Sequence, residues 1–481
     1  MVKVLVIDVG TTSLRTSLVS TSGEVSRLVQ RPLTVTSPQP GEAELDPIEI
    51  AALAIACAND TLAGEIVPYV AITNQRATTV MIDRATGEPI GPALGWQDLR
   101  TVIDCLVLQG SGLRLAPNQS ATKAQWLRNA LATDRDVLFA TLDGYLSHVL
   151  TAGASFVTDH SNVAVTGFVD TALDYDDGVL EALNIRRDQL AQIVPTTGQF
   201  GRATMLTGAP ELVALIGDQP SSLFGQNGVR PGDTKITFGT GSMLDQVRST
   251  SGPAVMNRFD SGCFPTVMRS TENEIWWGLE GICLSAGTCI DWLRDDLRIL
   301  DDVRDSSAIA QSLPDNGGVS FVPAFMGLGT PQWDFGARGA FFGLTRGSSR
   351  AHLIRAVLEG IAHNAVDLID AAEAETGVRP AVVRVDGGIS RNEFMVQTLA
   401  DASGCRIEVS AEAEATTRGA GLLAHVGTGA LSLDDVASLW NPAQVCTSTI
   451  DDVARTARRE EWRGFLERAG RTIPDLSAVS F

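Results

Sequence analysis

The sequence predicts an α/β fold made of two related halves. Two segments, residues 2–19 and 235–247, each read as a strand, a Gly-Thr turn and a second strand. They lie almost half a chain apart, which is too long for a solenoid repeat and suits a duplicated domain. Strand and helix patterns also follow one another in both halves, and this mixture indicates packed layers of helices and sheet.

In the first half, short runs of β-branched residues predict strands, and apolar residues at helical spacing predict helices. The expected elements are strands on either side of a polar bend within 69–83, helices over 120–132 and 178–192, and a strand over 212–218.

The same patterns continue in the second half. The expected elements are a strand over 274–281, helices over 284–300 and 352–376, a strand over 381–388, and helices over 392–402 and 452–470. The Gly-, Pro- and Asn-containing stretch 225–233 predicts a connector between the halves. We therefore expect an N-terminal domain at 1–228 and a C-terminal domain at 229–481.

The charge and composition exclude several functional classes. The 481 residues carry a formal net charge of −20, which disfavours nucleic-acid and anionic-membrane partners in the absence of a local basic patch. No apolar run approaches the roughly 18 to 20 residues of a membrane helix, and the N-terminus lacks a signal-peptide pattern. The cysteines form no CxxC pair, so a zinc clip is not expected. We expect a cytoplasmic protein.

The two Gly-Thr turns are the first candidate for ligand binding. In the segment Asp8–Thr12, DVGTT, glycine lets backbone N–H groups approach an anion, threonine hydroxyls add donors, and the aspartate can hold hydrated Mg²⁺. Such a turn alone also serves as a plain hairpin bend. A second copy at Gly239–Ser242, GTGS, favours phosphate binding, because two loops on two halves can clamp one polyphosphate across a cleft.

A third candidate is the glycine turn at 386–388, DGG, and the residues after it. Two glycines after a strand leave flat backbone against which a planar base or a ribose can rest. Asn392 can either cap the following helix or bind the ligand. A purely structural turn is the competing interpretation of this segment.

These segments together resemble the FGGY family of carbohydrate kinases, and within it the glycerol kinases most. Further matching segments keep the family's order from Asp8 to Gly421, nearly the whole chain. They include ITNQR at 72–76, GDQ at 217–219, LFGQ at 223–226, and the run from Pro323 to Gly347. The resemblance implies two actin-like, ribonuclease-H-like domains around an ATP cleft, with the polyol or sugar mostly against the N-terminal domain.

The resemblance also implies roles for single residues. Asp8 would serve Mg²⁺, and the other positions would serve ATP. The ATP set comprises Gly10, Thr11, Thr12 and Arg15 at the first turn, Gly239, Thr240 and Gly241 at the second, and Gly287, Gly388 and Asn392 at the nucleotide.

Asp218 is the candidate catalytic residue, because it ends a strand at a helix start and matches the proposed base of the family. Without the family match, an N-cap for a helix beginning near Ser221 is the favoured interpretation. A carboxylate with an ordinary pKa near 3.9 cannot remove a hydroxyl proton in advance. The proton must therefore move late, in a loose phosphoryl-transfer transition state.

The implied acceptor pocket departs from that of the glycerol kinases. Arg76, Trp96, Asp218 and Gln219 match family contacts to glycerol. Ala77 stands where glycerol kinases have glutamate, while Asn118 and Met243 stand where they have aromatic residues. Loss of the glutamate removes an acceptor for hydroxyls, and the smaller side chains enlarge the pocket. We expect a polyol or ketose larger than glycerol, of four or five carbons.

The function expected from the sequence is therefore ATP-dependent phosphorylation of a primary hydroxyl of a small polyol or ketose. An actin- or chaperone-like nucleotide switch is the alternative from another class, since the same clamp serves filaments and peptide-binding machines. The acceptor residues, which a switch does not need, speak against it. Many members of the family are dimers or tetramers, so a homo-oligomer is compatible with the resemblance.

Overall fold

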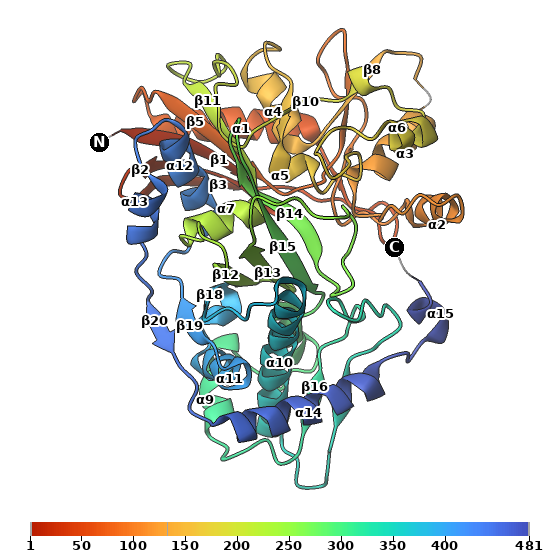
Figure 1. Ribbon diagram of the computed structural model, residues 1–481, viewed down its shortest axis with the longest axis vertical. Coiled ribbons are helices and arrows are strands. Elements are labelled where there is room, and N and C mark those ends of the chain that lie inside the picture. The colour runs from red at the N-terminus through yellow and green to blue at the C-terminus, as the bar shows by residue number, and fades with distance from the viewer. Residues whose placement is uncertain (1, 132, 480–481) are drawn as a thin grey trace.

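A computed structural model describes residues 2–131 and 133–479. Its two lobes each contain one mixed β-sheet and follow one another along the long axis of the molecule (Figure 1). The sheet of the first lobe has the order β11-β5-β1-β2-β3. Its strands are β1 (Lys3–Val9), β2 (Ser13–Ser20), β3 (Val25–Pro32), β5 (Tyr69–Asn74) and β11 (Glu211–Gly217).

The sheet of the second lobe has the order β14-β15-β13-β12-β18-β19-β20. Its strands are β12 (Thr234–Phe238), β13 (Ser242–Val247), β14 (Phe264–Ser270), β15 (Ile275–Cys283), β18 (Val382–Gly387), β19 (Arg406–Val409) and β20 (Gln444–Cys446).

Five neighbouring strands of the second sheet repeat the topology of the first sheet. In the first lobe, β1 pairs antiparallel with β2 and parallel with β5, and β5 pairs parallel with β11. In the second, β12 pairs antiparallel with β13 and parallel with β18, and β18 pairs parallel with β19. This repetition confirms the expectation of two related halves, each opening with a hairpin.

The first lobe surrounds its sheet with helices and short strand pairs. Apolar residues of β1 and β5 pack against α1 (Pro47–Leu62) and α4 (Leu142–Leu150), which form a buried core with them. The remaining helices are α2 (Val102–Gly110), α3 (Ser120–Leu131), α5 (His160–Val163), α6 (Asp177–Leu183) and α7 (Asp218–Gly225). The strand pairs are β4 (Glu44–Leu45) with β7 (Ala93–Leu94), β6 (Val80–Asp83) with β8 (Val137–Ala140), and β9 (Val157–Asp159) with β10 (Gln192–Val194).

The long helix α10 (Arg350–Thr376) runs through the core of the second lobe. The helix α14 (Asp452–Ala469) crosses the end of that lobe, where Trp462 Nε1 donates to Asp367 at 2.9 Å (Figure 1). The other elements are α8 (Gly287–Asp295), α9 (Ser306–Gln311), α11 (Glu393–Ser403), α15 (Pro474–Ser477), and the pair β16 (Ser320–Val322) and β17 (Ala340–Phe342).

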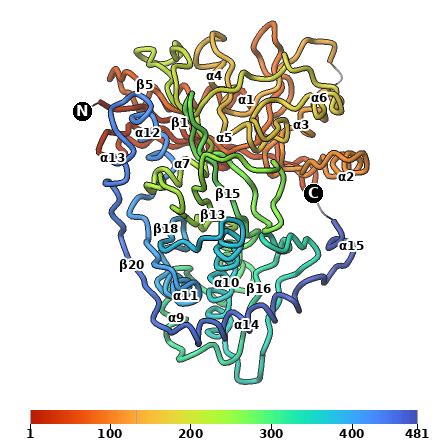
Figure 2. Tube along the Cα trace, viewed as in Figure 1, coloured from red at the N-terminus to blue at the C-terminus, as the bar shows by residue number. Residues whose placement is uncertain are grey.

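The chain returns to the first lobe and then runs back to the second. The trace in Figure 2 leads up to α12 (Ala415–Gly427) and α13 (Leu433–Ser438), then back down through β20 to α14. Buried residues of α12 pack with those of β1 and β11. Helix α12 also lies against α7, where a Cβ on Gly225 or Gly419 would collide with the backbone of the other helix. The division at residue 228 stays a prediction, and α12 ties the two lobes together.

Most expected elements lie where the patterns indicated, with three corrections. The helix expected over 178–192 ends at Leu183, because Asn184 adopts a left-handed conformation that stops it. The helix expected over 284–300 spans only Gly287–Asp295. Helix α7 begins at Asp218 itself, after Gly217 as N-cap, and not near Ser221. Residue 132, at the end of the helix expected over 120–132, lies outside the described residues.

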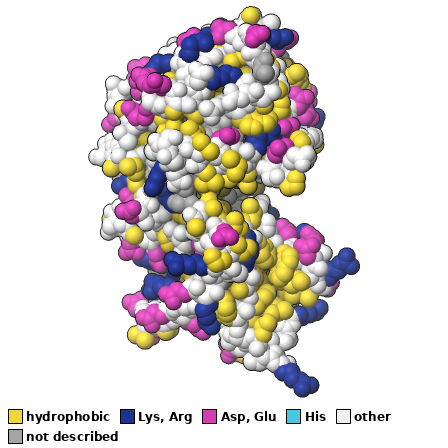
Figure 3. Space-filling model, turned by 90° about the vertical axis from the view of Figure 1, so that its right-hand side faces the viewer, with side chains coloured by type: hydrophobic (Ala, Val, Ile, Leu, Met, Phe, Trp, Pro, Cys, Tyr) yellow, Lys and Arg dark blue, Asp and Glu magenta, His cyan; other side chains and the backbone are white. Residues whose placement is uncertain are grey.

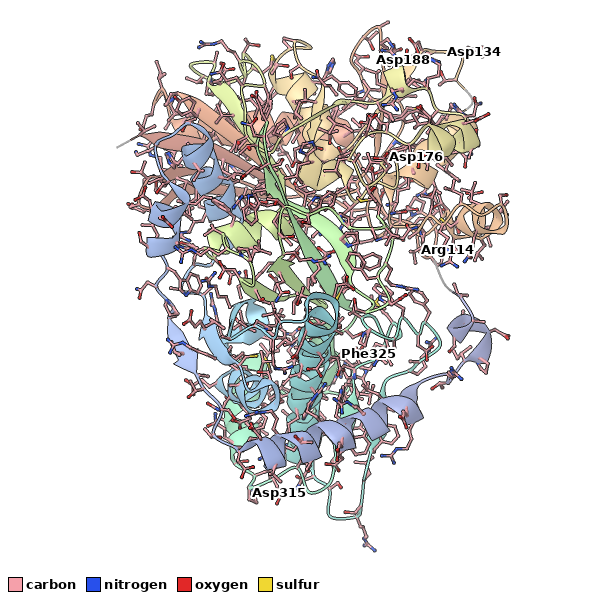
Figure 4. The ribbon with its side chains drawn as sticks, in the orientation of Figure 1. Arg114, Asp134, Asp176, Asp188, Asp315 and Phe325 are labelled. Atoms are coloured by element: carbon pink, nitrogen blue, oxygen red, sulfur yellow. The ribbon has the colours of Figure 1, made fainter. Side chains whose placement is uncertain are left out.

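The surface narrows between the two lobes, and hydrophobic side chains gather on both sides of the narrowing (Figure 3). Figure 4 shows Asp134 and Asp188 toward the outer end of the first lobe and Asp315 toward that of the second. Within the described residues, no helix combines the length and apolar character needed to cross a bilayer.

Candidate active site

Asp8 and the turn that follows it form the first part of the site. Asp8 lies near the end of β1, is 4 % exposed, and accepts a hydrogen bond from Thr417 Oγ1 of α12 at 2.8 Å. In the turn, the Gly10 backbone N–H donates to Ser13 at 3.0 Å. Thr11 Oγ1 accepts from Trp96 Nε1 at 3.2 Å. This hydrogen bond connects the turn, which is predicted to bind phosphate, to Trp96, which is predicted to bind the acceptor substrate.

The electrostatics around Asp8 suit a bound cation. Burial raises the pKa of Asp8 to about 6, although the Thr417 hydrogen bond and Arg15 lower it, and Asp218 and Glu414 add to the rise. Arg15 pairs with Asp8 across β1 and β2, and its guanidinium lies 3.3 Å from Glu414. A divalent cation would relieve the cost of this buried carboxylate charge.

Protein groups alone do not complete a metal site around Asp8. Among residues 2–131 and 133–479, no three His, Cys, Asp or Glu side chains gather as a metal cluster. Mg²⁺ is commonly held by one or two carboxylates together with substrate phosphates and water. Asp8 therefore fits a Mg²⁺ ion that arrives with a nucleotide.

The second turn is held against the start of α8. The backbone N–H of Gly287 donates to Gly239 O at 2.9 Å, and that of Ala286 donates to Thr240 O at 2.9 Å. A Cβ on Gly287 would lie 2.5 Å from Gly239 O, so only glycine allows this approach. The structure therefore places Gly287, which the resemblance assigns to the nucleotide, against the second turn at Gly239, Thr240 and Gly241.

The third glycine turn, at residues 386–388, comes shortly before the helix α11. Gly387 has a φ of +88° and lies so close to Phe238 that a Cβ would come within 2.1 Å of its carbonyl oxygen. A Cβ on Gly388 would meet no atom within 4 Å, so the backbone is uncovered only at Gly388. Asn392 Oδ1 accepts from Met395 N at 3.0 Å and caps α11, while its Nδ2 donates to Ser306 Oγ at 2.9 Å. The cap considered from the sequence is present, and the nucleotide role of Asn392 stays a prediction.

Asp218 and Arg76 meet at the junction of the lobes. Arg76 follows β5, and its Nε lies 3.4 Å from Asp218 Oδ1, which also accepts from the backbone N–H of Gln219 at 2.9 Å. A Cβ on Gly217 would lie 2.5 Å from Cδ of Arg76, so this glycine makes room for the arginine. Burial raises the pKa of Asp218, and Arg76 opposes the rise. Among the described residues, Asp218 Oδ2 has no hydrogen-bond partner.

The second lobe adds charged groups that the sequence did not indicate. Arg76 Nη2 donates to Glu280 of β15, and Arg76 Nη1 lies 3.4 Å from Thr266 Oγ1 of β14. Burial lowers the pKa of Arg76, but Glu280 and Asp218 outweigh burial and raise it. Arg76 therefore stays charged while it bridges the two lobes.

Three charged residues of the second lobe lie side by side on neighbouring strands of the second sheet. Asp245 of β13 stands opposite Lys235 of β12 on one side and opposite Glu280 on the other. Lys235 and Asp245 are fully buried, with their charged atoms 3.0 Å apart. The signal that could have revealed them is a charged residue inside an otherwise apolar strand, which seldom occurs without a partner.

The other residues that are predicted to bind the acceptor substrate are spread over several segments of the chain. Trp96 and Met243 are half-buried, and Met243 stands opposite Thr237 in the row next to the charged one. Ala77 is 5 % exposed, and its carbonyl accepts from Ser120 Oγ at 3.2 Å. Asn118 is exposed before α3, and its carbonyl accepts from Lys123 Nζ at 3.2 Å. The structure thus assigns no pocket contact to the Asn118 side chain, whose role stays a prediction.

The chain matches two family models. Residues 3–225 match the N-terminal domain of the FGGY family of carbohydrate kinases, and residues 234–428 match its C-terminal domain. The glycerol kinase of Halorhodospira halophila is 38 % identical, covering 97 % of this chain and 96 % of that protein. Glycerol kinase 2 of Thermotoga maritima is 35 % identical, covering 97 % and 98 %.

Solved structures share the fold over the full length. Plasmodium falciparum glycerol kinase with ADP superposes with a TM-score of 0.91 at 28 % identity, covering 100 % of this chain and 99 % of that one. Xylulose kinase of Lactobacillus acidophilus has a TM-score of 0.86 at 20 % identity, covering 97 % of each chain. The expectation of two actin-like domains is confirmed.

Proposed function

The chain belongs to the FGGY family of carbohydrate kinases, and from that premise we propose that it phosphorylates a polyol or ketose larger than glycerol, with four or five carbons. It is an ATP-dependent kinase of a polyol or sugar, as its relatives are. The nucleotide-switch alternative is not favoured. We expect the enzyme in the cytoplasm, and its assembly into a homo-oligomer stays a prediction.

The observation that carries the proposal is the pairing of Asp218 with Arg76 beside a methyl group at position 77. Arg76 and the Gln219 backbone engage Asp218 Oδ1. Oδ2 therefore remains to orient an acceptor hydroxyl. Ala77, next in the chain and buried, has no side-chain acceptor. A pocket that loses an acceptor for the hydroxyls of glycerol loses selectivity for glycerol.

ATP would lie across the two glycine turns. The residues that we assign to it are Gly10, Thr11, Thr12 and Arg15, then Gly239, Thr240 and Gly241, then Gly287, Gly388 and Asn392. Mg²⁺, held by Asp8 and the phosphates, would neutralise the charge of the transferring phosphoryl group. The raised pKa of Asp8 supports this assignment.

Asp218 would act on the acceptor. Its Oδ2 would hold a terminal primary hydroxyl in line with the γ-phosphorus of ATP. It would accept the hydroxyl proton as the new O–P bond forms and the bond from the γ-phosphorus to ADP, the leaving group, breaks. Burial raises the pKa of Asp218 and makes the carboxylate a better proton acceptor than one in water. Trp96 would pack its indole face against the carbon chain of the acceptor.

The testing experiment measures ADP release with Mg²⁺-ATP and a panel of glycerol, tetritols, pentitols, tetruloses and pentuloses. A blank without acceptor gives the rate of ATP hydrolysis. We expect one C4 or C5 compound to exceed glycerol at least tenfold in kcat/KM. Preference for glycerol would refute the larger substrate, and no turnover of any acceptor would refute the assignment of a small polyol or ketose.

A further inference from the structure

Helix α12 lies late in the chain, but its start packs against the predicted magnesium ligand. Thr417 in its first turn is fully buried, and its Oγ1 donates to Asp8 Oδ2 at 2.8 Å. Glu414, the N-cap of the helix, lies 3.3 Å from Arg15, the neighbour of Asp8 across β1 and β2. The start of α12 thus contacts both the carboxylate and the arginine that we assign to Mg²⁺ and ATP.

Close backbone contact with α7 fixes the position of this turn. A Cβ on Gly419 of α12 would collide with Ser221 O of α7, so only glycine permits this approach. Ser221 Oγ also donates to Thr416 O at 2.7 Å. Because α7 begins at Asp218, the packed pair of helices holds Thr417 in a fixed position relative to the predicted base.

The two carboxylate oxygens of Asp8 have different surroundings. Oδ2 is engaged by the hydroxyl of Thr417, which has a single proton to donate. Oδ1 accepts no hydrogen bond from the described residues and is not fully enclosed, although Asp8 as a whole is only 4 % exposed. A cation that approaches from solvent therefore meets Oδ1. A hydrogen bond to a ligating carboxylate fixes its orientation toward the metal.

We infer that Thr417 is a positioning residue for the magnesium site, because its hydroxyl holds Oδ2 of Asp8 and leaves Oδ1 to the Mg²⁺ that arrives with ATP. This inference rests on the proposed assignment of Mg²⁺ to Asp8. Thr417 acts through Asp8 and is not itself a metal ligand. Without the hydroxyl, Oδ2 loses its donor in the protein interior, and the carboxylate is free to turn. Loss of such an outer partner commonly lowers metal affinity by about ten- to a hundred-fold.

The test measures, by titration calorimetry on the full chain, how much Mg²⁺ tightens the binding of the non-hydrolysable ATP analogue AMP-PNP. The quantity compared is the ratio of the Kd in EDTA to the Kd in Mg²⁺, which does not depend on activity. Thr417→Val keeps the shape and removes the donor, so we expect the ratio to fall about tenfold, with the Kd in EDTA within about twofold of the wild type. Thr417→Ser keeps the hydroxyl and should keep the ratio. Equal weakening with and without Mg²⁺, or no change, would overturn the inference.

Asp8→Asn separates the inference from its premise. If Mg²⁺ binds at Asp8, this variant also lowers the ratio, and adding Thr417→Val to it lowers the ratio no further, because the group through which Thr417 acts is already lost. A further fall of about tenfold in the double variant would show that Thr417 acts independently and would contradict the positioning role. An unchanged ratio in Asp8→Asn alone would refute the magnesium assignment and the inference with it, while the ADP-release assay still decides the proposed substrate.

Two further variants test for a general effect on the helix. Thr428→Val removes a hydroxyl that donates to Ala424 O at 2.9 Å at the other end of α12, so it should leave the ratio unchanged. Thr417→Cys keeps a weak donor of similar size and should give an intermediate ratio, which maintains the test if valine impairs folding. A ratio for Thr428→Val as low as that for Thr417→Val would assign the effect to the helix as a whole and would overturn the inference.

Discussion

Lys123 places an amino group in the protein interior, and no carboxylate among the described residues accepts a hydrogen bond from it. We therefore predict that Lys123→Met stabilises the protein. Its side chain is fully buried in α3, and its Nζ donates to Asn118 O at 3.2 Å. Burial lowers the pKa of Lys123 from 10.5 to about 7, although Asp98 and Cys105 oppose this change. The fold therefore disfavours the charged form relative to the unfolded chain.

The magnitude follows from the two pKa values. At about 1.4 kcal/mol per pKa unit, Lys123 costs about 4 kcal/mol of stability at pH 7 and about 2 kcal/mol at pH 9. The sign of the pH dependence follows from the number of protons that the unfolded and the folded chain bind. Between pH 7 and 10.5 the unfolded chain keeps a proton that the folded chain has lost, so the stability of the wild type rises with pH. Methionine does not titrate and lacks this dependence.

The assay is urea unfolding of the wild type and Lys123→Met at pH 7, 8 and 9. The variant should be the more stable at pH 7, and its advantage should shrink by about 2 kcal/mol by pH 9. Lys3→Met, at a partly exposed lysine, is the control and should show no such change. An advantage of Lys123→Met that is the same at all three pH values would refute the reasoning, because loss of a hydrogen bond or a change of packing has no such pH dependence.

Four further predictions concern the reaction. Asp218→Asn should lower kcat by about 10² to 10⁴ with Mg²⁺-ATP affinity within about twofold of the wild type, and near-normal turnover would remove Asp218 from the mechanism. Ala77→Glu should raise kcat/KM for glycerol, relative to that for the preferred C4 or C5 compound, at least tenfold. An unchanged ratio would contradict our assignment of position 77. Asp8→Asn should weaken activation by Mg²⁺. In the wild type, kcat/KM for Mg²⁺-ATP should fall as pH drops below about 6, where Asp8 takes up a proton. A value of kcat/KM that does not fall below pH 6 would contradict the role of Asp8 as a Mg²⁺ ligand.

Local patterns were sufficient for much of the fold. The hairpins β1–β2 and β12–β13 were predictable because apolar runs and glycine turns are written in adjacent residues. Asp8 could be singled out because it follows a predicted strand and stands two residues before the glycine of a turn, whereas Asp218 was singled out through its match to the family. Helix ends were less predictable. Asn184 ends α6 by adopting a left-handed conformation, and Asp218 is the first residue of α7. Local helix propensity does not determine either of these helix ends.

The sequence by itself determined the α/β class, the two related halves, the glycine turns and the family, because these depend on residue order and short-range pattern. Only the tertiary structure decided that Arg76 bridges Asp218 and Glu280, and that Lys235 holds Gln219. It also decided that Thr417 reaches back to Asp8, a residue 409 positions away. The physical reason is that these partners meet through strand pairing and lobe packing, and the charge of a side chain does not indicate which distant group will neutralise it once water is excluded.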